Sequence, residues 1–170
     1  MEFSHLIAAR YSVRAYKPDP VPEAELAAML EAMRLAPTAC NNQPMRFIVV
    51  HTEGRQTDLK RIYGAEWFIQ APIVICACVM TSEAWVRRSD GKNHGNIDAA
   101  IAMDHLILAA ANEGLGTCWI CAFDPIAARE VLGLPDGVEP VAFTPLGFAA
   151  DLLREKSRKP IEELVSYEKW

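Results

Sequence analysis

The stretch NIDAAIAMDHLILAAANEG (residues 96–114) carries apolar side chains on nearly every side of the helix that its spacing predicts. A helix that is apolar all round is normally covered by its own core or by a second subunit. Two aspartates and one histidine interrupt the run, which is also too short to cross a bilayer. The stretch therefore predicts a central helix of a globular protein, and it leaves open whether one chain or two bury it.

Shorter elements precede this helix. Residues 22–35 predict a helix, because Pro22 suits a first turn and apolar residues then recur at helical spacing. The runs FIVVH (residues 47–51) and PIVICACVM (residues 72–80) are rich in β-branched residues and predict buried strands. A weaker helical pattern lies between them near residues 57–69. Residues 81–96 contain the polar run of a loop or lid.

Further elements follow the central helix. The segment DPIAAREVLG predicts a short helix, with Asp124 as N-cap, Pro125 in the first turn and Gly133 just past the end. The run PVAFTPLGFA (residues 140–149) predicts a third strand, and a polar tail begins at residue 151. With one plausible core and no flexible linker, we expect a single α+β domain over residues 1–170.

Composition limits the classes of function. Half of the 170 residues are hydrophobic, which is enough for one well-buried core. The net charge of −5 argues against a nucleic-acid partner held through phosphate contacts. The five cysteines are an odd number in a core-rich chain, so we expect buried thiols rather than bridges. The first residues lack a basic region followed by a long apolar run, and we expect a cytoplasmic protein.

The loop APTACNNQP (residues 36–44) is rich in amides and free of charge. Thr38, Asn41 and Gln43 both donate and accept hydrogen bonds, which suits the edge of a neutral ligand that carries both kinds of group. The simpler interpretation is that Thr38 and Asn41 only cap and turn the chain after Pro37.

Two cationic segments stand out in this acidic chain. Arg10, Ser12 and Arg14 alternate near the start, and alternate residues of an extended segment point to the same side. Near the other end, Ser157 separates Lys156 and Arg158. Guanidinium and hydroxyl groups in this arrangement match a phosphate. Taken alone, each segment is also compatible with a solvated surface.

Together, these segments resemble the FMN-dependent nitroreductase superfamily over essentially the whole chain, which would make this protein a compact member. The matching segments occur in the same order: RYSVRAY, APTACNNQP running into FIVV, GLGTCWICAFD, PLGFA and KSRKP. The resemblance implies a three-layer α/β/α sandwich of the α+β class, with a central, mostly antiparallel sheet. It further implies an intertwined homodimer with one FMN at each of two sites between the subunits.

The resemblance also assigns residues to the cofactor. The FMN phosphate would lie between the two cationic segments, the amide loop would reach the flavin from the partner subunit, and a third segment would pass its reactive nitrogen. The residues implied for these three parts are Arg10, Ser12, Arg14, Lys156 and Arg158; Pro37, Thr38, Ala39, Asn41 and Gln43; and Ile120, Cys121 and Ala122. Tyr11 is implied as a further cofactor residue. A flavin ring carries neutral donors and acceptors along one edge, so it needs amides there and cations only at its phosphate.

The implied activity is a ping-pong reaction with no catalytic side chain. NADH or NADPH would pass a hydride to FMN, and an electron-poor acceptor such as a nitroaromatic or a quinone would then take it, because the flavin itself carries the chemistry. Two alternatives stay open. One is a non-catalytic FMN-binding or redox-sensing protein, and the other is a specialised flavin enzyme such as a reductive dehalogenase.

Other motifs favour structural interpretations. GLGTCW lacks the third glycine of a dinucleotide fingerprint, and CWIC (residues 118–121) does not open a helix as a thioredoxin-like motif does. No further Cys or His pair stands at the spacing of a metal site, so we expect no bound metal. We expect packing roles for His94 and His105, although contact of the 81–96 loop with the nicotinamide dinucleotide stays open.

The sequence also departs from the pattern of the family. Cys121 and Ala122 stand where a Glu-Gly pair is common. The segment GAEWFIQAP (residues 64–72) lacks an Asn and a Lys that reach the flavin in larger members.

Overall fold

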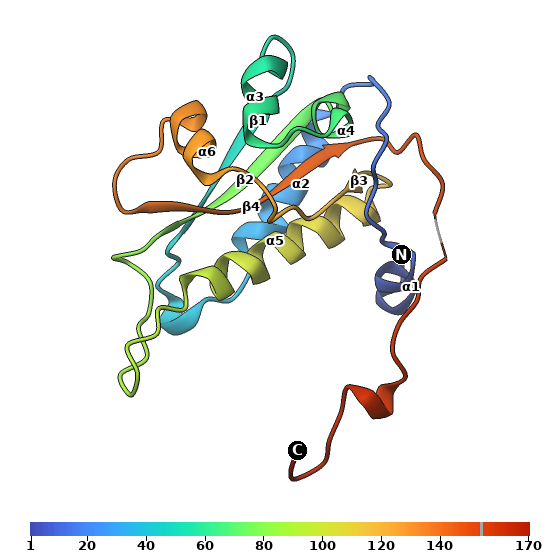
Figure 1. The fold of residues 1–170 in the computed structure, drawn as a ribbon. Helices are drawn as coiled ribbons and strands as arrows, with labels where there is room; N and C mark the ends of the chain where they lie inside the picture. The colour runs from blue at the N-terminus through green and yellow to red at the C-terminus, as the bar shows by residue number, and fades with distance from the viewer. Residues whose placement is uncertain (154) are drawn as a thin grey trace.

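The computed structural model describes residues 1–153 and 155–170 of the chain (Figure 1). Its elements are, in chain order, α1 (Phe3–Ala9), α2 (Glu23–Arg34), the 3-10 helix η1 (Ala39–Asn41), β1 (Met45–His51), α3 (Gln56–Ile62), α4 (Glu66–Gln70), β2 (Ile73–Met80), α5 (Gly95–Asn112), β3 (Gly116–Thr117), α6 (Pro125–Leu132), β4 (Val138–Gly147) and the 3-10 helix η2 (Ile161–Glu163).

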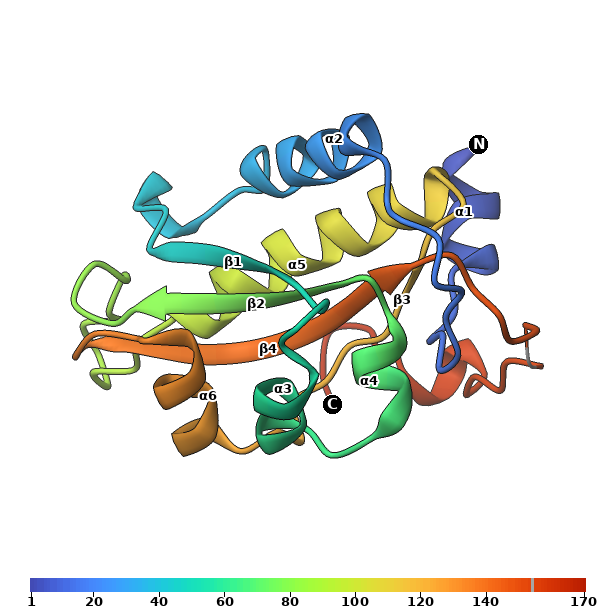
Figure 2. The same ribbon diagram turned by 90° about the horizontal axis from the view of Figure 1, so that it is seen from above.

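Four strands form one sheet in the order β1-β2-β4-β3, and each neighbouring pair is antiparallel. In the central strand β2, Ile75 lies opposite Val49 of β1 on one side and Thr144 of β4 on the other. Figure 2 shows α2 and α5 on one face of the sheet and α3, α4 and α6 on the other. The expected α/β/α sandwich of the α+β class is confirmed.

Residues 73–79 of β2 are buried because both faces of the sheet are covered, and only the last residue, Met80, is partly exposed. Ile73, Ile75 and Ala77 face α2 and α5, where they join a cluster with Met29 and Leu106. The residues between them, Val74, Cys76 and Cys78, join a second cluster with residues of α3, α4 and α6. Alternate side chains of a strand point to opposite faces, so a central strand with two covered faces is a continuous apolar run.

The cysteine prediction is confirmed for three of the five residues. Cys76, Cys78 and Cys118 are buried free thiols, whereas Cys40 and Cys121 are free but exposed. The Sγ atoms of Cys76 and Cys78 lie 3.5 Å apart on the same face of β2. The hydrogen bond between them and their burial raise the pKa of Cys76. Cys76 therefore behaves as a neutral core side chain.

Several predicted boundaries need correction. The helical pattern near residues 57–69 is two helices, α3 and α4, interrupted around Gly64, because glycine disfavours a helix interior. The helix α1 and the two-residue strand β3 were not predicted. α1 buries only Leu6, and β3 is too short to show an alternating pattern.

Two segments project from this body. Residues 81–94 form a turn-rich loop, held by a bridge between Val86 and Asn93 and by an ion pair between Arg87 and Asp90. The C-terminal segment leaves β4, passes α1 and extends away from the sandwich (Figure 1). Among the described residues, no helix has both the length and the apolar character that a membrane crossing requires.

Candidate functional site

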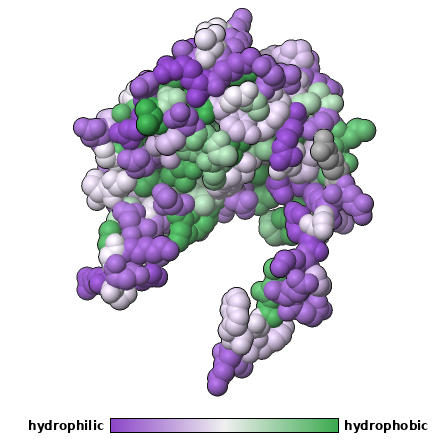
Figure 3. All heavy atoms as spheres, viewed as in Figure 1, coloured by the Kyte–Doolittle hydropathy of each residue, from purple (hydrophilic) through white to green (hydrophobic). Residues whose placement is uncertain are grey.

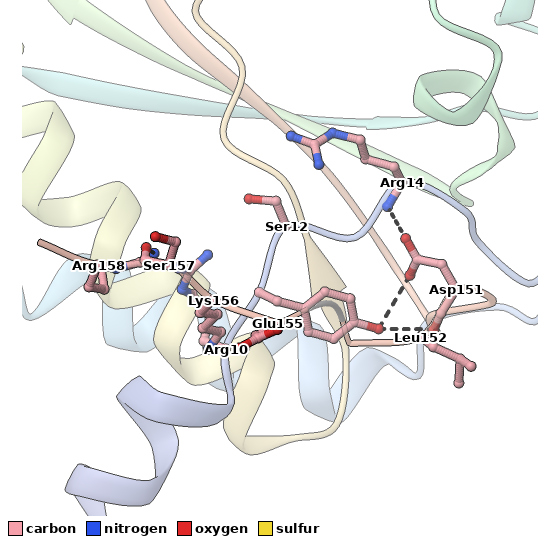
Figure 4. Close-up of a pocket in the computed structure, with 10 residues that line it drawn as sticks. Arg10, Ser12, Arg14, Asp151, Leu152, Glu155, Lys156, Ser157 and Arg158 are labelled. Atoms are coloured by element: carbon pink, nitrogen blue, oxygen red, sulfur yellow. Dashed lines mark hydrogen bonds between the residues drawn. The ribbon is translucent and has the colours of Figure 1, made fainter.

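The two cationic segments, which lie more than 140 residues apart in sequence, meet at one pocket. Figure 4 shows the side chains that line it. The pocket holds about 270 Å³ and is lined by Arg10, Tyr11, Ser12, Arg14, Asp151, Leu152, Glu155, Lys156, Ser157 and Arg158. All five residues predicted for the FMN phosphate, and Tyr11 with them, are therefore brought together. Arg10, Ser12 and Arg14 all line the pocket, and so does Tyr11 between them, which alternation alone does not predict.

The first cationic segment is fixed by its backbone. Ser12 forms a parallel bridge with Thr117 of β3, and the Val13 N–H donates to the Thr117 carbonyl at 2.9 Å. Val13 itself is buried against Gly116, where an added Cβ would lie 2.6 Å from a Val13 methyl group. Glycine at position 116 therefore allows the first segment to pack directly on the end of the sheet.

Asp151 fastens the other side of this segment. Its carboxylate accepts the Arg14 backbone N–H at 2.8 Å and the Tyr11 hydroxyl at 3.2 Å (Figure 4). Neither bond involves the guanidinium group of Arg14. Tyr11 was predicted as a cofactor residue, and its hydroxyl is occupied by Asp151 here. Asp151 itself was not predicted, because a lone aspartate before a basic tail carries no distinctive pattern.

The pocket concentrates positive charge. Partial burial lowers the pKa of Lys156, and the nearby guanidinium groups of Arg10 and Arg158 lower it further. The Lys156 ammonium group donates to the Ala8 carbonyl, and Arg158 donates to the Ser157 carbonyl at 2.7 Å. Because these cations repel one another, a multivalent anion between them would be stabilised. The donor set of guanidinium, ammonium and hydroxyl groups fits a phosphate.

The segment predicted to pass the flavin begins with a bridge to β4. Ile120 is buried and exchanges two backbone hydrogen bonds of 2.9 Å with Phe143. Cys121 and Ala122 are exposed, and their backbone N–H groups have no acceptor among the described residues. The segment therefore presents free backbone donors at an exposed surface.

The two cysteines of CWIC face different ways. Cys118 is buried beside the sheet, and burial is the largest cause that raises the pKa of its thiol. Cys121 is exposed, and its Sγ accepts the indole N–H of Trp119 at 3.0 Å. An extended segment points residues of opposite parity to opposite sides. This geometry agrees with the rejection of a dithiol redox pair.

The amide loop adopts an unusual backbone. Cys40, Asn41 and Gln43 have φ values of 53°, 56° and 52°, in the left-handed region that side chains disfavour. Such residues cost on the order of 1–2 kcal/mol each and cluster at functional sites. The Gln43 N–H donates to Thr38 Oγ1 at 3.1 Å, and the Gln43 amide donates to Asn41. Both predicted amides therefore lie together, at an exposed surface.

The amide loop and the cationic pocket lie at opposite ends of α5 (Figure 2). Ala39 contacts Asp98 in the first turn of this helix, whereas Arg10 and Tyr11 lie beside Ala111 and Gly114 at its end. The intervening helix spans roughly 20 Å at 1.5 Å per residue. One chain therefore does not bring the loop residues Pro37, Thr38, Ala39, Asn41 and Gln43 to the pocket.

The two histidines have structural partners. His105 Nδ1 lies 3.3 Å from the Ala32 carbonyl and connects α5 to α2. His94 is the N-cap of α5, and its ring packs edge-on to Trp85 with centroids 5.1 Å apart. Both positions agree with the expected packing roles.

Comparison with known proteins identifies the family to which this fold belongs. The family model described as "Nitroreductase family" matches residues 7–67 and 55–148. A nitroreductase family protein of Clostridium difficile 630 superposes with a TM-score of 0.93 and 34% identity, with all of both chains covered. FMN reductase (NAD(P)H) of Bacillus subtilis is 30% identical over 92% of this chain and 69% of its own. NADH dehydrogenase of Thermus thermophilus is 27% identical over 92% of this chain and 91% of its own. The chain belongs to the nitroreductase family.

Proposed function

We propose that this chain is an FMN-dependent oxidoreductase, a single FMN-binding domain that uses NADH or NADPH to reduce nitroaromatics, quinones or similar acceptors. The observation that carries the proposal is the meeting of Arg10–Arg14 and Lys156–Arg158 around one anion-sized pocket. The similarity to FMN reductase and NADH dehydrogenase supports the choice of cofactor and reductant. FMN, when bound, supplies hydride transfer between the nicotinamide and the acceptor in two successive half-reactions.

The residues of the chain would bind the FMN and orient its ring. Arg10, Arg14, Lys156, Arg158 and the Ser12 hydroxyl would bind the phosphate through charge-assisted hydrogen bonds. The free backbone donors of Cys121 and Ala122 would meet the flavin ring, where a fixed N–H stabilises negative charge as it develops. No side chain is required to move a proton or to attack the substrate.

The amide loop would serve the flavin of a second subunit. Asn41 and Gln43 lie together on an exposed loop about 20 Å from the cationic pocket of their own chain. A flavin that contacts both features must therefore lie between two copies of the chain. This requirement supports a homodimer with two sites, each built from both subunits.

Binding of FMN and riboflavin by variants tests the assignment. A hydrogen bond to a charged group contributes about 1.5 to 3 kcal/mol, so Arg14→Ala or Arg158→Ala should weaken FMN roughly ten- to a hundredfold. Riboflavin lacks the phosphate, and its affinity should be nearly unchanged. Arg34→Ala, which removes an exposed arginine paired with Glu31 on α2, is the matched control and should alter neither affinity. Equal losses for both flavins would refute the phosphate assignment.

A spectrum tests the activity. The visible absorption of bound FMN should bleach when NADH or NADPH is added without oxygen, and a quinone should restore it. Bound flavin that neither nucleotide bleaches would instead indicate a non-catalytic FMN-binding or redox-sensing protein.

A further inference from the structure

A buried carboxylate lies beneath the amide loop. Asp98 is only 3% exposed, and its Oδ1 accepts the Ala39 backbone N–H at 2.9 Å. Its Oδ2 is buried and has no hydrogen-bond partner among the described residues. A buried carboxyl group is costly unless it is hydrogen-bonded, and among the described residues only one of the two oxygens of Asp98 has a partner.

Asp98 is placed to hold the loop from the start of the central helix. It lies in the first turn of α5, where the positive end of the helix dipole stabilises a negative group. A carboxylate that accepts a backbone N–H forms a stronger bond than a neutral acceptor would form. The bond reaches the chain directly before Cys40 and Asn41, the first two left-handed residues of the loop.

The loop has few other attachments. Within it, the Gln43 N–H donates to Thr38 Oγ1 at 3.1 Å. Outside it, the Asn42 amide donates to the Glu83 carbonyl at 3.0 Å, and at the end of the loop the Pro44 carbonyl accepts the Met80 N–H of β2 at 2.7 Å. The Glu83 contact joins the loop to the exposed 81–94 segment, which is not part of the sandwich. The Asp98 bond is the contact that ties the loop to the central helix.

We infer that Asp98 is a positioning residue for the flavin ring: it fixes the strained amide loop in the shape that aims Asn41 and Gln43 at the ligand. This inference rests on the proposed function, in which those amides meet the ring of the partner subunit's flavin. Asp98 does not touch the flavin. It acts indirectly, through Ala39 and the amide loop. It therefore affects the contacts with the flavin ring and not those with the phosphate.

The test compares both flavins and measures the loop directly. Asp98→Ala should weaken FMN and riboflavin by the same factor, about tenfold, because both share the ring. It should also speed hydrogen exchange at the amides of residues 39–43 in the purified protein. Asp98→Asn keeps an oxygen that accepts the same bond, and should restore most of both properties. Ala39→Pro removes the donor, with φ at that residue also fixed by the proline ring, and should reproduce the losses seen in Asp98→Ala, with exchange read at residues 40–43.

Thr52→Val is the matched control. Thr52 is also buried, and its hydroxyl donates to the Ala71 carbonyl at 2.7 Å, remote from the loop. The variant should lose stability while both flavin affinities and the exchange at residues 39–43 stay as in the wild type. Unchanged exchange in Asp98→Ala and Ala39→Pro would overturn the inference, as would a loss confined to FMN. If the wild type bound no flavin, the proposed function would fail, while the exchange readout would still decide whether Asp98 holds the loop.

Discussion

Cys121 is the side chain at this site that is most easily mistaken for a catalyst. Its thiol is exposed and accepts the Trp119 N–H, and a thiol is a weak donor. A thiolate would repel negative charge on a reduced ring, whereas the backbone N–H at the same residue stabilises that charge whatever side chain it carries.

Cys121→Ser should therefore keep flavin bound and lower NAD(P)H-dependent quinone reduction by less than about tenfold, or roughly 1.4 kcal/mol in the barrier. Cys118→Ser, at the buried cysteine, should behave likewise. Steady-state rates at matched flavin occupancy check this. A variant that retains its flavin but loses nearly all turnover would show that the sulfur takes part in the chemistry.

At the scale of single elements, α6 has the most complete boundary signals. The Asp124 carboxylate accepts the N–H groups of Ile126 and Ala127 at 2.9 and 3.0 Å, and Gly133 ends the helix in the left-handed conformation. Loss of such an N-cap costs about 1 kcal/mol. Asp124→Ala should thus lower the melting temperature by roughly 2–4 °C, the shift expected for a chain of this size.

Two further variants check the origin of that change. Asp124→Asn retains a capping oxygen and should melt close to the wild type. Asp136→Ala removes an exposed carboxylate 3.8 Å from Arg129, and such pairs contribute little. If Asp136→Ala melted as low as Asp124→Ala, the cap would not explain the loss.

The elements that the sequence predicted are those whose pattern is local. β2 is a continuous apolar run, and α6 has a cap, a proline and a terminal glycine, so each could be recognised without its neighbours. β3 could not, because a two-residue strand exists only through its pairing with β4.

The residues of the candidate site also differ in whether a local sequence pattern identifies them. The cationic segments were visible as charge, and the amide loop as composition. The roles of Asp151 and Asp98 could not be predicted from the sequence. Each aspartate accepts a backbone N–H from a distant segment, and such a bond produces no pattern in the neighbouring residues. Their roles depend on contacts across 137 and 59 residues of sequence.

At the scale of the molecule, one chain leaves much apolar surface uncovered. Along α5, Ile97 is 48% exposed, and Ile101 and Leu108 are partly exposed on the same stripe. The view in Figure 3 shows hydrophobic residues on the face between the two projecting segments. The C-terminal segment adds the exposed residues Leu152 and Ile161. An exposed apolar stripe on a helix, together with exposed apolar residues on a projecting segment, is typical of an interface.

We therefore expect a homodimer whose dissociation releases FMN, since the pocket and the amide loop of one site would come from different subunits. Leu108→Asp places a charge on the α5 stripe, and should shift the protein to a monomer that has lost most of its flavin. Light scattering gives the mass, and absorption of the same sample gives the flavin content. Ile126→Asp alters a residue that is 70% exposed in the first turn of α6, outside this stripe, and should remain a flavin-loaded dimer. A wild-type monomer that holds FMN at full occupancy would contradict the two-subunit site, because a single chain keeps its amide loop and its cationic pocket at opposite ends of α5.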